Sequence, residues 1–175
     1  MAHHSAADGH INTLAELGAL RKEWSLAGQK VVFTNGVFDL LHKGHVTYLA
    51  SAARLGDVLV VGVNDDESVR RLGKGEDRPI VQESDRAAVV AALRAVDAVV
   101  LFGSDTPLSI IAALRPDVLV KGGDYDAECT DPHDPRYIVG STEVRSEGGK
   151  VVTIDLVPGR STTAIAQKLK GQGRP

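Results

Sequence analysis

Two histidines, His42 and His45, form the pair of side chains in this sequence best suited to chemistry on a phosphate group. They follow the turn-forming pair Asn35-Gly36, and Gly44 stands between them. Residues three apart share one face of a helix, and the free N–H groups at a helix N-terminus attract anions. Glycine also lets a ligand approach the backbone closely. If a helix begins here, the segment predicts a cradle for phosphate.

Other roles for the two histidines are compatible with the residue types alone. Both could be structural histidines whose ring nitrogens find partners inside the fold. They could also bind zinc, which would need a third ligand. Asp39 could supply that ligand, although a carboxylate placed there is better suited to capping the turn. Phosphate binding, a structural role and a metal site therefore stay open at this level.

A second candidate phosphate site lies near the end of the chain. Ser161, Thr162 and Thr163 follow Pro158-Gly159 and open the last predicted helix. Their hydroxyls and the free N–H groups of a helix start can donate to phosphate oxygens. The plainer alternative is an ordinary N-cap. The presence of the histidine segment favours the phosphate interpretation.

The elements that must position these residues can be predicted from hydrophobic periodicity. Helical spacing or capping residues predict helices at about 12–24, 44–55, 66–71, 84–94, from 107, and 161–169. Short runs rich in Val, Leu and Ile predict buried strands at residues 30–34, 57–63, 97–102, 117–121 and 150–156. Continuous apolar strands separated by helices indicate a parallel sheet covered on both faces. The prediction is an α/β fold: a doubly wound, Rossmann-like, five-stranded parallel sheet with helices on both faces.

In such folds the ligand lies beyond the carboxyl ends of the strands. The residues that follow each predicted strand are therefore candidates, and they include Asn64 and the segment from Lys121 to Tyr125. Gly122 and Gly123 allow close backbone approach to a ligand, and Asp124 can accept from a sugar hydroxyl. The alternative is a glycine turn with an aspartate on the surface.

Composition limits the classes of partner. The formal net charge is −3 and no Lys/Arg cluster is present, which argues against nucleic acid. No apolar run approaches the about 20 residues that a membrane crossing needs. A single cysteine, Cys129, cannot form an internal disulfide, which favours a cytoplasmic location. Residues 1–10 lack a signal-peptide core and are predicted to be disordered, before a single domain at 11–175.

The segment from Gly36 to His45 resembles a known motif. It matches the pattern G-x-F-D-x-x-H-x-G-H in full, in the expected context of strand, turn and helix. This pattern is typical of the nucleotidyltransferase superfamily of cytidylyltransferases and small adenylyltransferases. A Ser/Thr cluster at the start of the last helix is the second motif of that superfamily, and residues 161–163 match it.

Within this superfamily, the chain resembles the D-glycero-β-D-manno-heptose 1-phosphate adenylyltransferases from about residue 14 to 170. The segments GVNDDESVRRLGKG, VKGGDY, IVGSTEV and STTAI carry the resemblance, and VKGGDY discriminates most. The resemblance implies transfer of AMP from ATP to a sugar 1-phosphate, with release of pyrophosphate. It also implies Mg²⁺ as the counterion of ATP, no metal held by the protein alone, and a homodimer.

The resemblance further implies roles for individual residues. His42 and His45 would hold the triphosphate and stabilise the transition state, with Lys74 of the Gly-rich segment GKGEDR as a third catalytic residue. Nucleotide binding is expected of Thr34, Asn35, Gly36, Val37, Phe38, Gly44, His45, Arg86, Gly123, Asp124, Ser161, Thr162 and Thr163. Substrate binding is expected of Asp39, Asn64, Arg78, Lys121 and Tyr125.

Several alternatives to this activity remain. Glycerol-3-phosphate cytidylyltransferases carry an arginine a few residues before the Ser/Thr motif, where Leu156 and Val157 stand in this chain. Pantetheine-phosphate adenylyltransferases are a weaker alternative, because KGGDY is not their signature. A nucleotide-binding module without activity and a zinc-dependent hydrolase are the alternatives from other classes.

Overall fold

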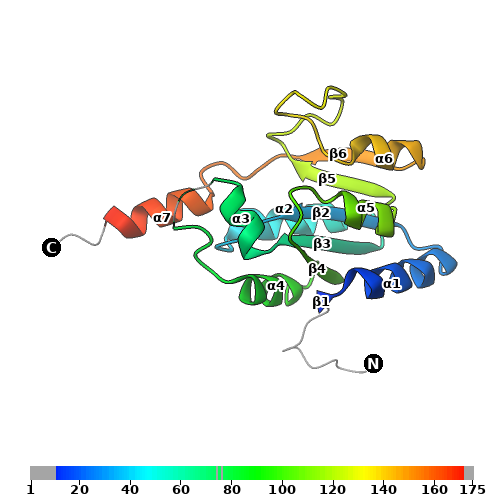
Figure 1. Ribbon diagram of the computed structural model, residues 1–175, viewed down its shortest axis with the longest axis horizontal. Helices are drawn as coiled ribbons and strands as arrows, with labels where there is room; N and C mark the ends of the chain where they lie inside the picture. The colour runs from blue at the N-terminus through cyan, green and yellow to red at the C-terminus, as the bar shows by residue number, and fades with distance from the viewer. Residues whose placement is uncertain (1–10, 74, 76, 172–175) are drawn as a thin grey trace.

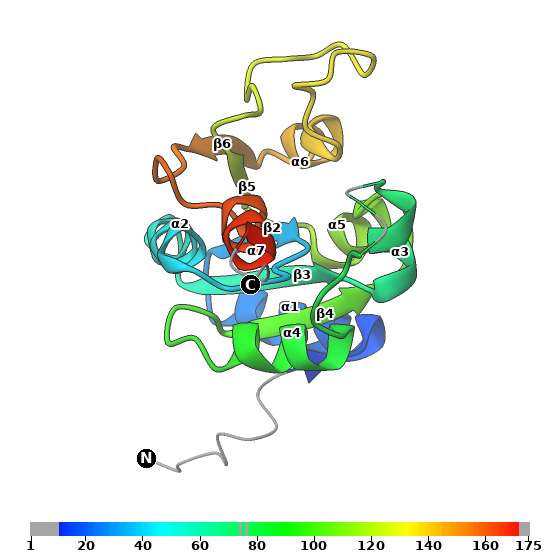
Figure 2. The same cartoon turned by 90° about the vertical axis from the view of Figure 1, so that its left-hand side faces the viewer.

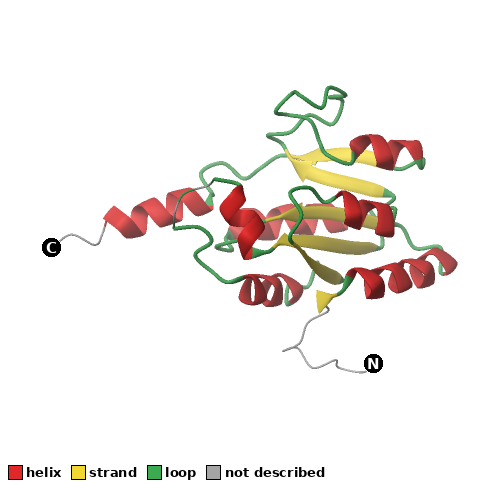
Figure 3. Ribbon diagram, in the orientation of Figure 1, coloured by secondary structure: helices red, strands yellow, loops and turns green. Residues whose placement is uncertain are grey.

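A parallel sheet lies between two layers of helices in the computed structural model, which describes residues 11–73, 75 and 77–171 (Figures 1 and 3). The strands are β1 (Ile11–Asn12), β2 (Val31–Gly36), β3 (Val58–Asn64), β4 (Ala98–Phe102), β5 (Val118–Gly122) and β6 (Lys150–Ile154). The helices are α1 (Leu14–Leu26), α2 (Lys43–Ala53), α3 (Asp66–Arg71), α4 (Glu83–Ala91), α5 (Leu108–Leu114), α6 (Ser141–Ser146) and α7 (Thr162–Gly171). The predicted disorder of residues 1–10 falls outside the described residues.

The strand order is β1-β4-β3-β2-β5-β6, and each neighbouring pair is parallel. The predicted α/β class with a parallel sheet is confirmed, but the prediction of five strands was wrong, because the sheet has six. The extra strand is β1, which has only two residues and pairs Ile11 with Val99 at the edge of the sheet. So short a segment carries no periodicity, and its pairing comes from tertiary context.

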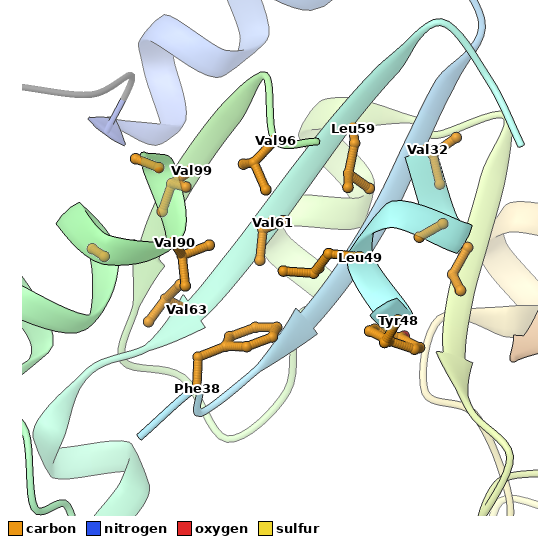
Figure 4. Close-up of a cluster of buried hydrophobic side chains, with 14 of the residues drawn as sticks. Val32, Phe38, Tyr48, Leu49, Leu59, Val61, Val63, Val90, Val96 and Val99 are labelled. Atoms are coloured by element: carbon orange, nitrogen blue, oxygen red, sulfur yellow. The ribbon is translucent and has the colours of Figure 1, made fainter. Parts of the chain in front are cut away.

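Two hydrophobic clusters cover the two faces of the sheet. On one face, Leu49 of α2 and Val90 of α4 pack against alternate strand residues such as Val61 (Figure 4). On the other face, Leu17 of α1 and Ile110 of α5 join the second cluster, together with residues of α6. Valine, leucine and isoleucine make up most of both clusters, as expected for a sequence with 4% aromatic residues.

Two element boundaries differ from the sequence-based prediction. Helix α4 begins at Glu83 after Gln82, which makes no side-chain capping bond, and it ends at Ala91 rather than near residue 94. Helix α6 was not predicted, because six largely polar residues show no helical periodicity. Its position follows from topology, since parallel strands β5 and β6 need a crossover connection.

The order of the strands places a topological switch point beside β2. Strands β3 and β4 are added on one side of β2, whereas β5 and β6 are added on the other. Crevices at such points, outside the carboxyl ends of the strands, are the usual ligand sites of open α/β sheets. Helix α7 begins near this edge and extends away from the sheet (Figures 1 and 2). Within the described part of the chain, no helix has both the length and the hydropathy needed to cross a membrane.

Candidate active site

A cleft of about 690 Å³ lies at the carboxyl ends of β2 and β5. This volume is in the range of small-molecule sites, about 300–1,000 Å³. The lining comes from the turn after β2, the first turn of α2, the end of β5 and the first turn of α7. The predicted site residues in this lining are Asn35, Gly36, Val37, Phe38, His42, Gly44, His45, Asn64, Lys121, Asp124, Tyr125, Ser161, Thr162 and Thr163.

His42 is the N-cap of α2. Its backbone is extended, with φ −143° and ψ 172°, and its Nδ1 accepts a hydrogen bond from the Gly44 N–H at 3.1 Å. Because Nδ1 acts as the acceptor, the proton of the neutral ring resides on Nε2. The start of α2 therefore offers an imidazole donor beside free backbone N–H groups.

His45 lies against His42 and Phe38. The two imidazole rings stack with centroids 4.0 Å apart and planes 21° apart. The Phe38 ring lies 5.4 Å from the His45 ring at 60°. Nδ1 of His45 is buried without a hydrogen-bond partner among residues 11–73, 75 and 77–171. A protonated ring would bury a second N–H donor in this environment, so the contacts favour the neutral form.

The electrostatics agree with this geometry. Burial, and next the neighbouring His42, lower the pKa of His45 from 6.5 to about 4. Burial, and next the charge of Arg160, also lower the pKa of His42. Both rings are therefore neutral near pH 7 in the unliganded protein. A bound phosphate would oppose these shifts, because a nearby negative charge favours the protonated imidazole.

Gly44 is required by the packing of His42. A Cβ atom at this position would lie 2.8 Å from both Cε1 and Nδ1 of the His42 ring, and 3.3 Å from Cβ of Arg160. These separations are shorter than normal van der Waals contacts. The absence of a side chain at Gly44 thus leaves room for the imidazole of His42 over the first turn of α2.

The ends of β2 and β5 are joined across the switch point. Nζ of Lys121 donates to Oδ1 of Asn35 at 2.6 Å, and it lies 5.5 Å from the ring centroid of Tyr125. Three residues predicted from two separate strand ends, those of β2 and β5, are thereby brought together. The arrangement places a cation at the floor of the cleft.

The start of α7 forms another wall of the cleft. Oγ of Ser161 accepts from the Ala164 N–H at 3.1 Å, as an N-cap does. Oγ1 of Thr162 donates to the carbonyl oxygen of Leu40 at 3.3 Å, which ties α7 to the turn before His42. Two helix starts therefore face one cleft, and both offer N–H groups to an anion.

Some predicted residues do not line the cleft. Thr34 is fully buried, and its hydroxyl bonds to Oη of Tyr48 at 2.7 Å. Gly123 is absent from the lining, and a Cβ atom there would lie 3.1 Å from the carboxylate of Asp155. Lys74, the third predicted catalytic residue, falls outside the described residues.

Asp39 and Arg78 were predicted to bind substrate, but the structure pairs them with each other. Asp39 is 4% exposed, and its carboxylate accepts from the N–H groups of Ile80 at 2.8 Å and Val81 at 2.9 Å. The Arg78 guanidinium donates to the second carboxylate oxygen. Neither side chain lines the cleft. These bonds also occupy the carboxylate that the zinc interpretation needed as a third ligand.

Arg86 was predicted to bind nucleotide, but it is 1% exposed and does not line the cleft. Each nitrogen of its guanidinium donates to a protein oxygen. Nε bonds to the Val81 carbonyl at 2.9 Å, Nη1 to the Val37 carbonyl at 2.6 Å, and Nη2 to Asp66 at 2.7 Å. In the structure, the guanidinium of Arg86 is therefore bonded to the turn after β2 and to α3.

Other lining residues were missed by the sequence-based prediction. Arg160 lines the cleft, and its guanidinium makes no ion pair or hydrogen bond with the described residues. Its position directly before Ser161 was a usable signal. Tyr48, Tyr137 and Leu156 also contribute to the lining. Tyr137 follows an irregular loop, for which periodicity gives no information.

The described residues contain no group of three or more His, Cys, Asp or Glu side chains placed to hold a metal ion. The carboxylates that line the cleft are Asp105 and Asp124. A metal ion here would therefore depend on ligands from a bound molecule and from water, as Mg²⁺ commonly does with nucleotides.

Comparison with known proteins adds independent findings. A family model described as cytidylyltransferase-like matches residues 33–168. Bifunctional protein HldE of Methylobacillus flagellatus is 53% identical over 159 residues, which cover 91% of this chain and 31% of that protein. HldE of Magnetococcus marinus is 56% identical over 149 residues, which cover 85% of this chain and 29% of that protein. The chain thus spans about a third of the length of these curated relatives.

Two solved structures share the fold. The lipopolysaccharide core biosynthesis protein from Thermoplasma volcanium GSS1 aligns with a TM-score of 0.57 and 29% identity, over 74% of this chain and 98% of that one. A pantoate-beta-alanine ligase from Francisella tularensis aligns with a TM-score of 0.58 over 92% of this chain and 77% of that one. At 13% identity, the second likeness concerns the fold alone.

Proposed function

Because this chain belongs to the cytidylyltransferase-like family, we propose that it is a nucleotidyltransferase that transfers AMP from ATP to a sugar 1-phosphate. The proposed acceptor is D-glycero-β-D-manno-heptose 1-phosphate, and the products are ADP-heptose and pyrophosphate. The observation that carries the proposal is the stacked pair His42 and His45 at a helix start that faces a second helix start across one cleft.

The chemistry is an in-line displacement at the α-phosphorus of ATP. An oxygen of the sugar phosphate forms the new P–O bond, while the bond to the β-phosphate oxygen breaks and pyrophosphate leaves. The nucleophile is already an anion, so the reaction needs no strong general base. Catalysis then depends on positioning and on stabilisation of negative charge.

The residues of the cleft suit this task. Nε2–H of His42 and the exposed edge of His45 would donate to the phosphate chain, beside the N–H groups that open α2. The first turn of α7, from Ser161 to Thr163, would receive the β- and γ-phosphates. Arg160 would add a positive charge where pyrophosphate departs. Lys121 would hold the acceptor phosphate or the α-phosphate.

Mg²⁺ is proposed as the counterion of ATP rather than as a resident ion. The carboxylates in the lining, Asp105 and Asp124, could contact its water shell. When bound with ATP, Mg²⁺ would neutralise part of the charge on the triphosphate.

The acceptor and the base are supported by relatives rather than by geometry. The HldE proteins are about 50% identical over most of this chain, and the Thermoplasma volcanium protein is named for lipopolysaccharide core biosynthesis. The family description, in contrast, refers to cytidylyl transfer. CTP with glycerol 3-phosphate is therefore the pairing to test against ATP with heptose 1-phosphate.

The test is a matrix of co-substrates with detection of pyrophosphate and of product mass. ATP, CTP and GTP are each combined with heptose 1-phosphate, glycerol 3-phosphate and pantetheine phosphate. We expect turnover with ATP and heptose 1-phosphate, and background rates for a His45→Ala variant. Turnover with CTP and glycerol 3-phosphate would replace the proposal. ATP binding by calorimetry without any turnover would indicate a binding module.

A homodimer, implied by the family resemblance, and a cytoplasmic location, favoured by the single cysteine, remain predictions. Light scattering of the purified chain over a range of concentrations would test the first. Fractionation of cells that express the native protein would test the second.

A further inference from the structure

On the basis of the proposed function, we infer that Asp39 and Arg86 are positioning residues for His45. They hold Phe38 in a left-handed backbone conformation from both sides, and the Phe38 ring in turn supports the His45 imidazole. Neither Asp39 nor Arg86 touches the nucleotide or the sugar phosphate in this assignment.

The conformation of Phe38 needs an explanation. Its φ is 51°, and Arg115 is the other non-glycine residue with positive φ in the described part of the chain. A bulky side chain avoids this region because Cβ approaches the following carbonyl oxygen. Such a residue persists where the surroundings over-determine its geometry, and functional sites are where these residues cluster.

The bonds on the two sides of Phe38 supply that constraint. The carbonyl of Val37, on the preceding residue, accepts from Nη1 of Arg86 at 2.6 Å. The carboxylate of Asp39, on the following residue, accepts from two backbone N–H groups and from Arg78. Arg86 also donates to the carbonyl of Val81. The hydrogen bonds on both sides of Phe38 are therefore anchored in one segment, residues 78–81.

The ring of Phe38 transmits this constraint to the site. Phe38 is 6% exposed, and its ring lies in the hydrophobic cluster beneath α2 (Figure 4). A Cβ atom on Gly36 would lie 3.2 Å from the ring, while the His45 ring lies 5.4 Å away from it. The ring thus separates the end of β2 from the imidazole, and rotation of Phe38 would free the imidazole to move.

The burial of the two charges fits this role better than ligand contact. A buried charge is tolerated when it is paired and fully hydrogen-bonded. Arg86 uses all three of its nitrogens on protein oxygens, and its partner Asp66 is held in turn by the Glu83 carboxylate through its own N–H at 2.7 Å. A ligand would have to displace these bonds to reach the guanidinium.

The Asp39→Asn variant is the first test. It keeps the side-chain shape and one oxygen for the N–H groups, but it removes the charge that pairs with Arg78. We expect kcat to fall by about 10-fold or more, while KM for ATP changes by less than about 3-fold. In ¹⁵N NMR of the His side chains, the pKa of His45 should rise from about 4 toward 6.5 as the ring gains solvent.

Two other results would overturn the inference. If Asp39 contacts substrate, KM for that substrate rises while the NMR titration of His45 stays unchanged. If Asp39 is merely structural, the unfolding midpoint falls while the folded variant keeps wild-type kcat and the wild-type His45 titration.

Arg86→Lys gives a second, independent test. Lysine keeps the charge but cannot reproduce the planar fork that reaches three acceptors. We expect a loss of kcat comparable to that of Arg86→Gln, whereas a phosphate-binding arginine would be partly rescued by the charge of lysine. Arg115→Lys is the matched control, because it changes the other left-handed non-glycine residue, which lines a separate cleft at the opposite end of the sheet.

If Arg86→Lys fails to fold, the Asp39→Asn titration still decides the matter. The NMR titration needs no substrate, so it tests the positioning role of Asp39 independently of the proposed nucleotidyltransferase activity. A wild-type protein without turnover on ATP and heptose 1-phosphate contradicts the proposed function, whereas an unchanged His45 titration in Asp39→Asn contradicts the positioning role.

Discussion

Replacement of Gly44 by alanine should separate activity from stability. The new Cβ would lie 2.8 Å from two atoms of the His42 ring, whereas normal carbon contacts lie at about 3.5–4.0 Å. The ring must therefore move by roughly 0.7–1.2 Å, a shift estimated from that contact distance. The move breaks the bond from the Gly44 N–H to Nδ1 and disturbs the stack with His45. A displacement of about 1 Å at a reacting centre can cost about 100-fold in rate, or about 2.7 kcal/mol.

The fold should tolerate the same change. The main clash is with a side chain that can turn away, and Gly44 lies within α2, where alanine is favoured over glycine by up to about 1 kcal/mol. This gain offsets the loss of the N-cap bond of His42, which costs about 1 kcal/mol. We therefore expect the unfolding midpoint to change little while kcat falls by about 100-fold.

Gly18→Ala is the matched control. Gly18 lies within α1, and a Cβ atom there would meet nothing within 4 Å. This variant should gain about 0.5–1 kcal/mol of stability and keep wild-type kcat. The assays are pyrophosphate release under saturating substrates and thermal unfolding of both variants. Wild-type kcat in folded Gly44→Ala would refute the assigned role of the His42 ring position.

Three further predictions concern the charges of the site. His45→Ala should lower kcat by on the order of 100-fold or more with little change in circular dichroism, and unchanged turnover would remove His45 from the mechanism. Because the pKa of His45 is about 4 when folded and 6.5 when unfolded, the unfolded chain binds more protons between these values. The free energy of unfolding should therefore fall as pH drops from 6.5 toward 4, and His45→Gln should lose this part of the slope in denaturant titrations. Arg160→Ala should lower kcat/KM for ATP by about 10-fold, and Arg160→Lys should restore part of this loss. Arg54→Ala, at the far end of α2, should have no effect, and an unchanged kcat/KM in Arg160→Ala would exclude the phosphate contact.

Residues whose role depends on local pattern could be predicted from the sequence. Continuous apolar runs indicated strands β2 to β6, although β6 is only partly buried rather than buried as predicted. The topology rule then placed strand-end residues at one edge. Asn35, Lys121 and Ser161 were brought to one cleft on that basis. Strand β1 escaped prediction because two residues at a sheet edge carry no period.

Roles that depend on tertiary partners could not be predicted in this way. Arg86 has the charge expected of a phosphate ligand. Because Arg86 lies far from Val37 along the chain, the sequence gives no sign of the hydrogen bond between them. Arg160 follows a glycine turn and has no periodic neighbour, so its position directly before Ser161 was its one signal, and its place in the cleft depends on how α7 leaves the sheet. Residue type indicates the chemistry that a side chain can do, while burial decides what it contacts.

The bond between Lys121 and Asn35 has a kinetic consequence for substrate capture. The ammonium is already oriented before a ligand arrives. If Lys121 holds a phosphate as proposed, that phosphate would exchange one acceptor for another instead of ordering a freely rotating side chain. Such an exchange lowers the entropic cost of capture. It also makes release easier, because Asn35 is available to take back the same proton donor when the product departs.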